Sequence, residues 1–225
     1  MCRFRKPTAT LSDKHKIIKT HMDNSFVYFG SGTVIGELSN FARCPNPFQW
    51  KDHFWNSSEA AYACWLRVDK LDWHRFAVGG DLSDLKTGIA LLFPENVVAK
   101  KIKHYGSKCS GMKPEMIGII PKLATKQKYA KKIGLRLTPR DEAKCEEKLL
   151  FDIFVEILIE KYTHNPGFRD VLLSTRGKKL IEFDRGAVRE TAKGRPPLWT
   201  GQIKEGVMYG RNLQGDIQEH VRSLF

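Results

Sequence analysis

Two polar side chains near the start of this sequence lie among aromatic residues. Asn40 belongs to the stretch GELSNF (36–41), and Glu59 belongs to FWNSSEAAYACW (54–65). An amide or a carboxylate costs free energy when it is buried without a partner, so a fold by itself gains little from either. A carboxylate can activate water, and an amide can hydrogen-bond hydroxyl or phosphate groups. The pair therefore predicts a functional site.

The element that would position Glu59 is a helix over residues 58–68. Ser57 or Ser58 can cap its start, and apolar residues recur along it at three- and four-residue intervals, which predicts an amphipathic helix. Glu59 then lies in the first turn, where the helix dipole stabilises a carboxylate even without any chemistry. The position of Glu59 in the helix therefore allows both a structural and a functional explanation.

Asn40 is expected on or beside a loop. Residues 26–41 (FVYFGSGTVIGELSNF) begin with β-branched and aromatic residues and continue through Gly30, Gly32 and Gly36. This pattern predicts a short strand, then a turn and a loop that ends near Asn40.

A second group of candidate residues lies near the end of the chain. The stretch LWTGQIKEGVMYGRNLQGDIQEHVRSL (198–224) combines an aromatic residue, several glycines and a basic residue with Asn212, just before a predicted helix. Glycines let the backbone approach a ligand closely, and the unpaired amides of a helix N-terminus suit phosphate. Glycine-rich turns before helices also serve only to reverse the chain, so an anion site and a plain turn both remain open.

The rest of the chain is predicted to be mostly helical. Residues 145–162 follow a strong helical pattern with a wide apolar face, typical of a central core helix. A shorter helix is predicted over 167–175, and a last helix from about Gly215. Because helix outweighs strand, the predicted fold is mainly α with a few short strands (α+β). The apolar positions of the long helix are Leu150, Phe154, Ile157 and Leu158.

Length and composition are those of a globular protein. A chain of 225 residues suits a single compact domain, which we expect over residues 26–225 behind a Lys-rich, partly disordered extension over 1–25. No apolar run approaches the roughly 20 residues needed to cross a bilayer, and the start lacks the apolar stretch of a signal peptide. We therefore expect an intracellular protein, cytoplasmic or nuclear, with no membrane partner.

The formal net charge of +13 is large for this length. Such a field raises the local concentration of phosphate groups, whether on a nucleotide, a nucleic acid or an acidic membrane. A highly charged surface that faces only water gives the same composition. The net charge therefore indicates a partner with phosphate groups, but it does not distinguish such a partner from a surface that faces only water.

Cysteines and histidines argue against several other classes of protein. The five cysteines are scattered without a CxxC pair, which predicts reduced thiols, and Cys64 is interpreted as a small buried residue rather than a nucleophile. The seven histidines show no spacing typical of metal ligands, so no metal and no cofactor is predicted. The sequence also lacks the nucleophile-elbow pattern of a serine hydrolase.

Four stretches, taken in order, resemble the NADAR family, also called the YbiA or DUF1768 family. They are GELSNF, FWNSSEAAYA, VLLSTRGKKLIE, and LWTG followed by GRNLQGDIQEHVR. The resemblance covers about residues 26–70 and 147–225, with a weak continuation at Lys100, while the segment at about 71–145 is diverged. It implies a compact α-rich domain tied to ADP-ribose and NAD metabolism. Known members hydrolyse phosphoribosylated intermediates of the riboflavin pathway or remove ADP-ribose from guanine bases.

The resemblance also implies a set of site residues. Glu59 matches the Glu of the family's Ser-Glu-His-Tyr motif, while the family's His falls at Ala60 and its Gln at Ala63. The acidic residue expected three positions before the tryptophan falls at Pro196. Either Asp184 or Glu190 fills that role from a shifted loop, or the activity is altered or absent. The other matched positions are Ser39, Asn40, Phe41, Trp199, Gly201, Asn212 and Gly215.

The implied reaction is hydrolysis of a ribosyl N-glycosidic bond, which requires a carboxylate to activate water or support an oxocarbenium-like centre. Glu59 is the predicted carboxylate, and Asn40 would hydrogen-bond ribose hydroxyls or phosphate. Lys100 and Arg211, with the terminal glycine turn, would hold phosphates. Trp199, and less securely Tyr62 or Trp55, would stack on a base, whereas Trp65 is expected in the core.

Two other functions remain open. The first is a catalytically inactive module that binds ADP-ribose or ADP-ribosylated nucleic acid, which the missing family acid favours. The second is a plain basic protein whose aromatic, Lys and Arg side chains contact nucleic-acid strands directly.

Overall fold

The computed structural model describes residues 25–30, 35–83, 130–131, 134–138 and 142–225. By their contacts they fall into two compact units. The terminal unit takes its described residues from 1–39 and 171–225, and the central unit takes its described residues from 40–170. Residues 1–24 of the predicted basic extension, and Lys100, lie outside the described residues.

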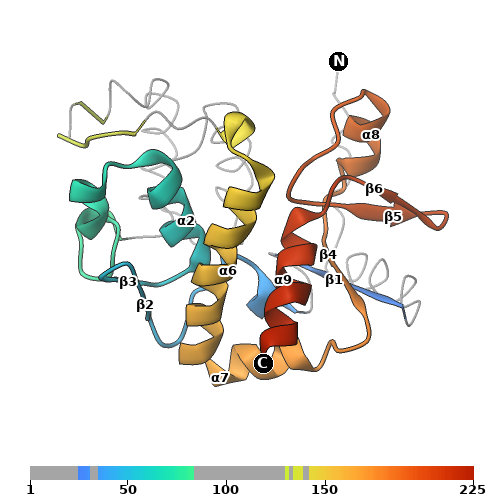
Figure 1. The fold of residues 1–225 in the computed structure, drawn as a ribbon, viewed down its shortest axis with the longest axis horizontal. Helices are drawn as coiled ribbons and strands as arrows, with labels where there is room; N and C mark the ends of the chain where they lie inside the picture. The colour runs from blue at the N-terminus through green and yellow to red at the C-terminus, as the bar shows by residue number, and fades with distance from the viewer. Residues whose placement is uncertain (1–24, 31–34, 84–129, 132–133, 139–141) are drawn as a thin grey trace, which may run out of the picture. The chain divides into compact units, whose positions relative to one another are not determined.

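The central unit contains a hairpin and two long helices (Figure 1). Strands β2 and β3 pair antiparallel, with Trp50 opposite His53. Helices α2 and α6 pack against each other, and α6 also contacts β2. The elements in chain order are β2 (Phe48–Trp50), β3 (His53–Trp55), α2 (Ser58–Arg67), the 3-10 helices η2 (Lys70–Arg75) and η5 (Glu142–Lys144), and α6 (Glu147–His164).

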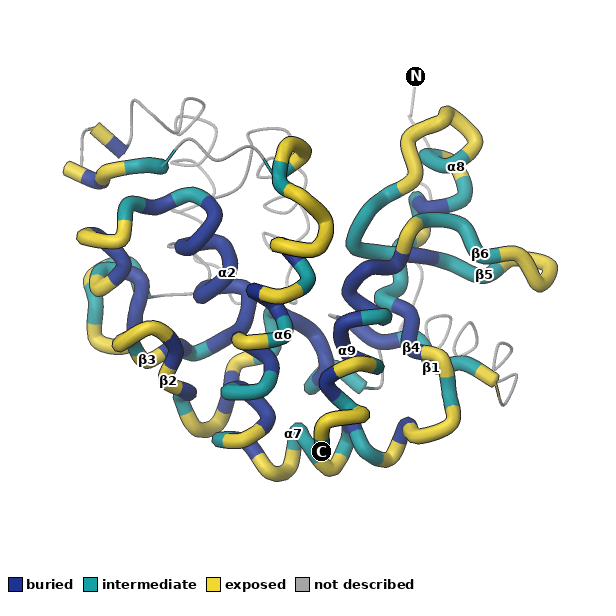
Figure 2. Tube along the Cα trace, viewed as in Figure 1, coloured by how far each residue is buried: buried dark blue, intermediate teal, exposed yellow. Residues whose placement is uncertain are grey.

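Helix α2 begins where the sequence predicts. The Ser57 side chain caps it by accepting a hydrogen bond from the Ala60 amide at 3.2 Å. The helix is more buried than an amphipathic pattern predicts, because every residue from Ser58 to Leu66 is buried (Figure 2). Its small buried residues, such as Ala61 and Ala63, allow close approach of the elements that contact it, which include α6, β3 and η2.

Helix α6 confirms the prediction of a central core helix. Tyr62 of α2 stacks on Phe154 of α6 with the ring centroids 4.1 Å apart. The predicted apolar positions of α6 are all buried, namely Leu150, Phe154, Ile157 and Leu158.

The terminal unit is built around two short parallel strands and one helix (Figure 1). Strand β1 pairs parallel with β4, and Phe29 lies opposite Glu182. Strands β5 and β6 form an antiparallel hairpin, and α9 packs on β4. The elements are β1 (Phe26–Phe29), η1 (Gly36–Leu38), β4 (Lys179–Glu182), α8 (Ala187–Ala192), β5 (Gln202–Lys204), β6 (Val207–Tyr209) and α9 (Leu213–Leu224). Helix α7 (Pro166–Leu173) contains the point where the chain leaves the central unit.

The described elements confirm the predicted fold class. Helices carry more of the described chain than strands do, and all named strands belong to two-stranded sheets, which is an α+β arrangement. Among the described residues, no helix has the length and hydropathy needed to traverse a bilayer.

Candidate functional site

The two residues that predicted a site are joined at the start of α2. The Glu59 amide donates a hydrogen bond to the Asn40 carbonyl oxygen at 2.9 Å. The hydroxyl of Ser58 donates to the same carbonyl at 3.3 Å and lies 3.4 Å from the side-chain oxygen Oδ1 of Asn40. Asn40 is 5% exposed and Glu59 is 9% exposed. The loop that ends in Asn40 is therefore fixed to the first turn of the helix that carries Glu59.

Tyr62 lies one turn after Glu59 in α2 and binds a second carboxylate. The Tyr62 hydroxyl donates to Oε1 of Glu142 at 2.7 Å. Burial raises the pKa of Tyr62 far above its ordinary value, and the negative charges of Glu142 and Glu59 raise it further. The phenol therefore stays protonated as a hydrogen-bond donor. Sequence analysis missed Glu142, because it lies within the diverged segment and belongs to no recognisable motif.

Two aromatic residues predicted to stack on a ligand belong to the core. Trp55 is fully buried, and its indole nitrogen donates to the Trp50 carbonyl at 3.0 Å. Tyr62 is 5% exposed and is stacked on Phe154. Protein atoms cover both rings in this structure, and ligand stacking by Trp55 and Tyr62 stays a prediction. Trp65 is buried as expected.

Ser39 and Phe41 flank Asn40 in the sequence. Ser39 is 2% exposed, and its amide ends η1 by donating to the Gly36 carbonyl at 3.0 Å. Phe41 is half-buried. Substrate contact by Ser39 and Phe41 stays a prediction.

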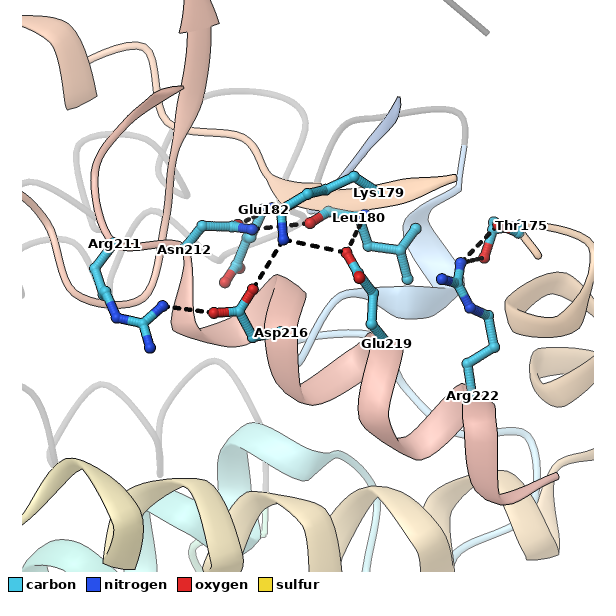
Figure 3. Close-up of polar contacts among 9 residues, drawn as sticks. All are labelled: Thr175, Lys179, Leu180, Glu182, Arg211, Asn212, Asp216, Glu219 and Arg222. Atoms are coloured by element: carbon cyan, nitrogen blue, oxygen red, sulfur yellow. Dashed lines mark hydrogen bonds and ion pairs between the residues drawn. The ribbon is translucent and has the colours of Figure 1, made fainter. Parts of the chain in front are cut away.

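In the terminal unit, Asn212 joins α9 to β4 (Figure 3). Its side-chain nitrogen donates to the Leu180 carbonyl at 2.9 Å, and its side-chain oxygen accepts from the Glu182 amide at 3.0 Å. The residue is buried and adopts a left-handed conformation with φ 56°, which Asn tolerates better than most residues. Both polar ends of this side chain thus bind the edge of β4 and hold the start of α9 there, and substrate contact by Asn212 stays a prediction.

Backbone carbonyls already accept hydrogen bonds from the amides that were expected to bind phosphate at the start of α9. The amide of Arg211 donates to the Pro197 carbonyl at 2.8 Å, and that of Leu213 donates to the Leu198 carbonyl at 2.9 Å. The Asn212 amide donates to the Thr200 carbonyl at 3.3 Å, and the Gln214 amide donates to the Trp199 carbonyl at 3.2 Å. The prediction of unpaired amides is wrong here, because the segment 197–200 satisfies them.

The glycines of this region serve close packing of the chain on itself. A Cβ on Gly215 would overlap the Leu180 carbonyl oxygen and the Asn212 side chain. A Cβ on Gly201 would lie 3.0 Å from the Met208 sulfur and 3.2 Å from the Tyr209 carbonyl oxygen. Glycine at 215 therefore permits the approach of α9 to β4. The sequence analysis instead expects this lack of a side chain to let a ligand approach the backbone.

Arg211, the predicted phosphate-binding cation, pairs with a carboxylate in this structure (Figure 3). Its guanidinium donates to Oδ2 of Asp216 at 2.5 Å. Oδ1 of Asp216 accepts from the Lys179 ammonium at 3.0 Å, and the same ammonium lies 3.6 Å from Glu219. The Asp216 and Glu219 carboxylates therefore compete with any phosphate for Arg211 and Lys179.

Asp184 lies against the loop that contains Trp199 and Gly201. Its carboxylate accepts from the Gly186 amide at 2.7 Å and from the Thr200 hydroxyl at 3.2 Å. The Asp184 amide in turn donates to the Gly201 carbonyl at 3.1 Å. Trp199 is half-buried. A carboxylate thus adjoins the tryptophan loop even though the expected family position holds Pro196.

The burial of Cys64 agrees with the sequence analysis. Cys64 is fully buried, and burial raises the pKa of its thiol, as an inert core residue requires. No cluster of three or more His, Cys, Asp or Glu side chains suited to a metal ion occurs in the described part of the chain.

The comparisons with known proteins find matches among solved structures. No family model matches the chain, and no curated protein matches it. Among solved structures, the chain is similar to the NMR structure of the E. coli protein YbiA, at 16% sequence identity and a TM-score of 0.43. The alignment covers 90% of this chain and 86% of that one.

Proposed function

We propose that this protein is an N-glycoside hydrolase that acts on an ADP-ribosyl or phosphoribosyl compound. The substrate is either an ADP-ribosylated guanine in nucleic acid or a phosphoribosylated intermediate of the riboflavin pathway. The observation that carries the proposal is the junction of Asn40 and Glu59, because it fixes the two motif residues to each other at one helix start. Chemistry that depends on both side chains needs such a constraint.

Glu59 supplies the carboxylate in this reaction. The bond from ribose C1′ to the base nitrogen breaks, water adds its hydroxyl to C1′, and the departing nitrogen gains a proton. Glu59 takes the proton from the attacking water or supports the positive charge at C1′. It lies in the first turn of α2, at the positive end of the helix dipole.

Asn40 binds the sugar in this proposal. Its side-chain amide can donate to a ribose hydroxyl or a phosphate oxygen while its carbonyl remains bound to the Glu59 amide. Asp184 is proposed as the acid that compensates for Pro196. Its bond to Thr200, next to the matched tryptophan and glycine, supports this assignment.

The test is a chromatographic assay of purified protein with ADP-ribosylated guanine DNA, phosphoribosylated riboflavin precursors and NAD. The wild type should release a base or ADP-ribose, and Glu59→Gln should lose at least about 100-fold in turnover, because the carboxylate acts in the transition state. Glu146→Gln is the matched control, since Glu146 is an exposed glutamate at the start of α6. Equal turnover in all three proteins would contradict the assignment of Glu59.

A binding module is the second candidate, and Pro196 at the expected acid position favours it. In that case ADP-ribose should raise the melting temperature of the wild type without being converted. Asp184→Asn separates the two functions: it should abolish turnover in an enzyme and leave the melting shift unchanged in a binding module.

A further inference from the structure

Four cationic side chains lie exposed on and around the short helix α8. Between residues 185 and 195 the chain has four basic residues and a single acid, Glu190. All four basic residues are exposed. We call this set the α8 basic surface, and it consists of Arg185, Arg189, Lys193 and Arg195.

Three of these cations converge on one carboxylate. Glu190 lies 3.0 Å from the Arg189 guanidinium, 3.5 Å from the Lys193 ammonium and 3.2 Å from the Arg195 guanidinium. The hydrogen bond from Arg189, together with the charges of Lys193 and Arg195, holds the pKa of Glu190 below its ordinary value. Glu190 therefore stays ionised near neutral pH.

One negative charge cannot balance three positive charges at these separations. Like charges that share a small surface repel each other, and a carboxylate that gathers them brings them closer together. Fold stability does not require this arrangement, since exposed ion pairs of this kind contribute little. An anion with several negative charges in a row would relieve the repulsion.

We propose that the α8 basic surface binds the phosphodiester backbone of a single-stranded nucleic acid. A strand carries phosphates at regular intervals and can therefore meet several cations at once. A membrane-binding surface would need apolar side chains that insert between lipids, and residues 185–195 expose no large apolar side chain. Backbone contacts of this kind hold a strand in register and carry no sequence information.

The proposed surface lies in the same segment as Asp184. The Asp184 carboxylate binds the Gly186 amide immediately before α8, so a strand bound by α8 would pass near this carboxylate. Binding of the strand requires no bond cleavage, and the inference goes beyond the proposed hydrolysis. A Glu59→Gln protein should bind the strand as the wild type does, which keeps the two proposals separable.

The experiment measures fluorescence anisotropy of a labelled 20-nucleotide oligothymidylate over a series of salt concentrations. Replacing all four residues of the α8 basic surface by Gln should weaken binding at least about tenfold at low salt. The slope of log affinity against log salt should become shallower by about 3, because each of the four lost phosphate contacts changes it by roughly 0.7. The control replaces four exposed cations elsewhere by Gln, and it should change the affinity less than about threefold. These control residues are Lys70, Lys144, Lys148 and Arg176.

Glu190→Gln should have the opposite effect on oligonucleotide binding. Removal of the competing carboxylate frees three cations, so affinity should rise by a few fold and the salt slope should steepen.

Equal losses of oligonucleotide affinity in the α8 variant and in the control variant would overturn the proposal, because general charge would then explain binding. Loss of binding to phosphatidylserine vesicles with unchanged oligonucleotide binding would also overturn it. Circular dichroism checks that each variant is folded.

Discussion

The backbone amide of Glu59 donates a hydrogen bond to the backbone carbonyl of Asn40 at 2.9 Å. This bond uses main-chain atoms, so it depends on the path of the chain and not on the two side chains. The bond therefore persists when the side chain of Glu59 or Asn40 is replaced. Side-chain substitutions at these positions can therefore separate function from folding.

Asn40→Ala should reduce turnover at least about tenfold while the fold survives. The junction to Glu59 remains, and the expected loss of stability is about 1 kcal/mol, the typical value of one hydrogen bond. Steady-state kinetics and thermal melting measure the two effects. Ser57→Ala is the control: it removes the cap of α2 and should cost about 1 kcal/mol without changing turnover per folded molecule. Parallel losses of activity and stability in both variants would argue that Asn40 is only structural.

Gly215→Ala should destabilise the protein severely, by about 3 kcal/mol or more. The added methyl group would overlap the Leu180 carbonyl, so α9 would have to move away from β4. Urea denaturation measures the change. Gly167→Ala is the matched control, because no atom lies within 4 Å of the new Cβ and Gly167 lies in helix α7. That change should be neutral or stabilise by up to about 1 kcal/mol.

The ion pair between Asp72 and Arg136 predicts a dependence of stability on pH. Hydrogen bonds from the Arg136 side chain hold the pKa of Asp72 below its ordinary value of 3.8. A lowered pKa means that the ionised carboxylate stabilises the folded state above the unfolded pKa. This stabilisation is lost as the pH falls through the lower folded pKa.

Asp72→Asn should therefore lower the melting temperature at neutral pH, and the difference from the wild type should shrink below about pH 4. Thermal melting at several pH values measures it. Asp152→Asn provides the control, since the Asp152 carboxylate is half-exposed and pairs with an exposed lysine. A difference that stays constant down to about pH 2 would contradict the role assigned to the Asp72 carboxylate.

Asp52→Gly should stabilise the β2–β3 hairpin by about 0.5–1 kcal/mol. Lys51 and Asp52 form the two-residue turn and have φ of 48° and 65°, values that favour glycine. Denaturant unfolding measures the gain. Asp52→Ala removes the same carboxylate but keeps a Cβ, so it should bring no gain. An equal gain from both variants would attribute the effect to charge rather than to backbone conformation.

Sequence patterns predicted the elements whose signals are local. The cap at Ser57 and the apolar positions of α6 located two helices, because capping and periodicity act within a few residues. The same patterns could not tell which side chains face a ligand. Trp55 and Tyr62 have the residue types of a stacking site, and only their packing against Trp50 and Phe154 showed them to be core residues.

The terminal stretch 198–224 illustrates the same limit. Glycine, Asn212 and a helix start are equally typical of a phosphate site and of a chain reversal, because both use bare backbone and helix amides. The carbonyls of 197–200 pair with those amides, and the contact between α9 and β4 uses Gly215. These partners are distant enough in sequence, Leu180 above all, that no local pattern reports them.

The sequence by itself determined the residue types that can do chemistry, the helix that carries Glu59 and the predominance of helix over strand. The tertiary structure decided which of those residues are already engaged. A hydrogen bond or a close packing contact between distant segments depends on the folded path of the chain, as the link between Tyr62 and Glu142 shows. Local propensity fixes an element, but only tertiary contact decides whether its polar groups remain available to a ligand.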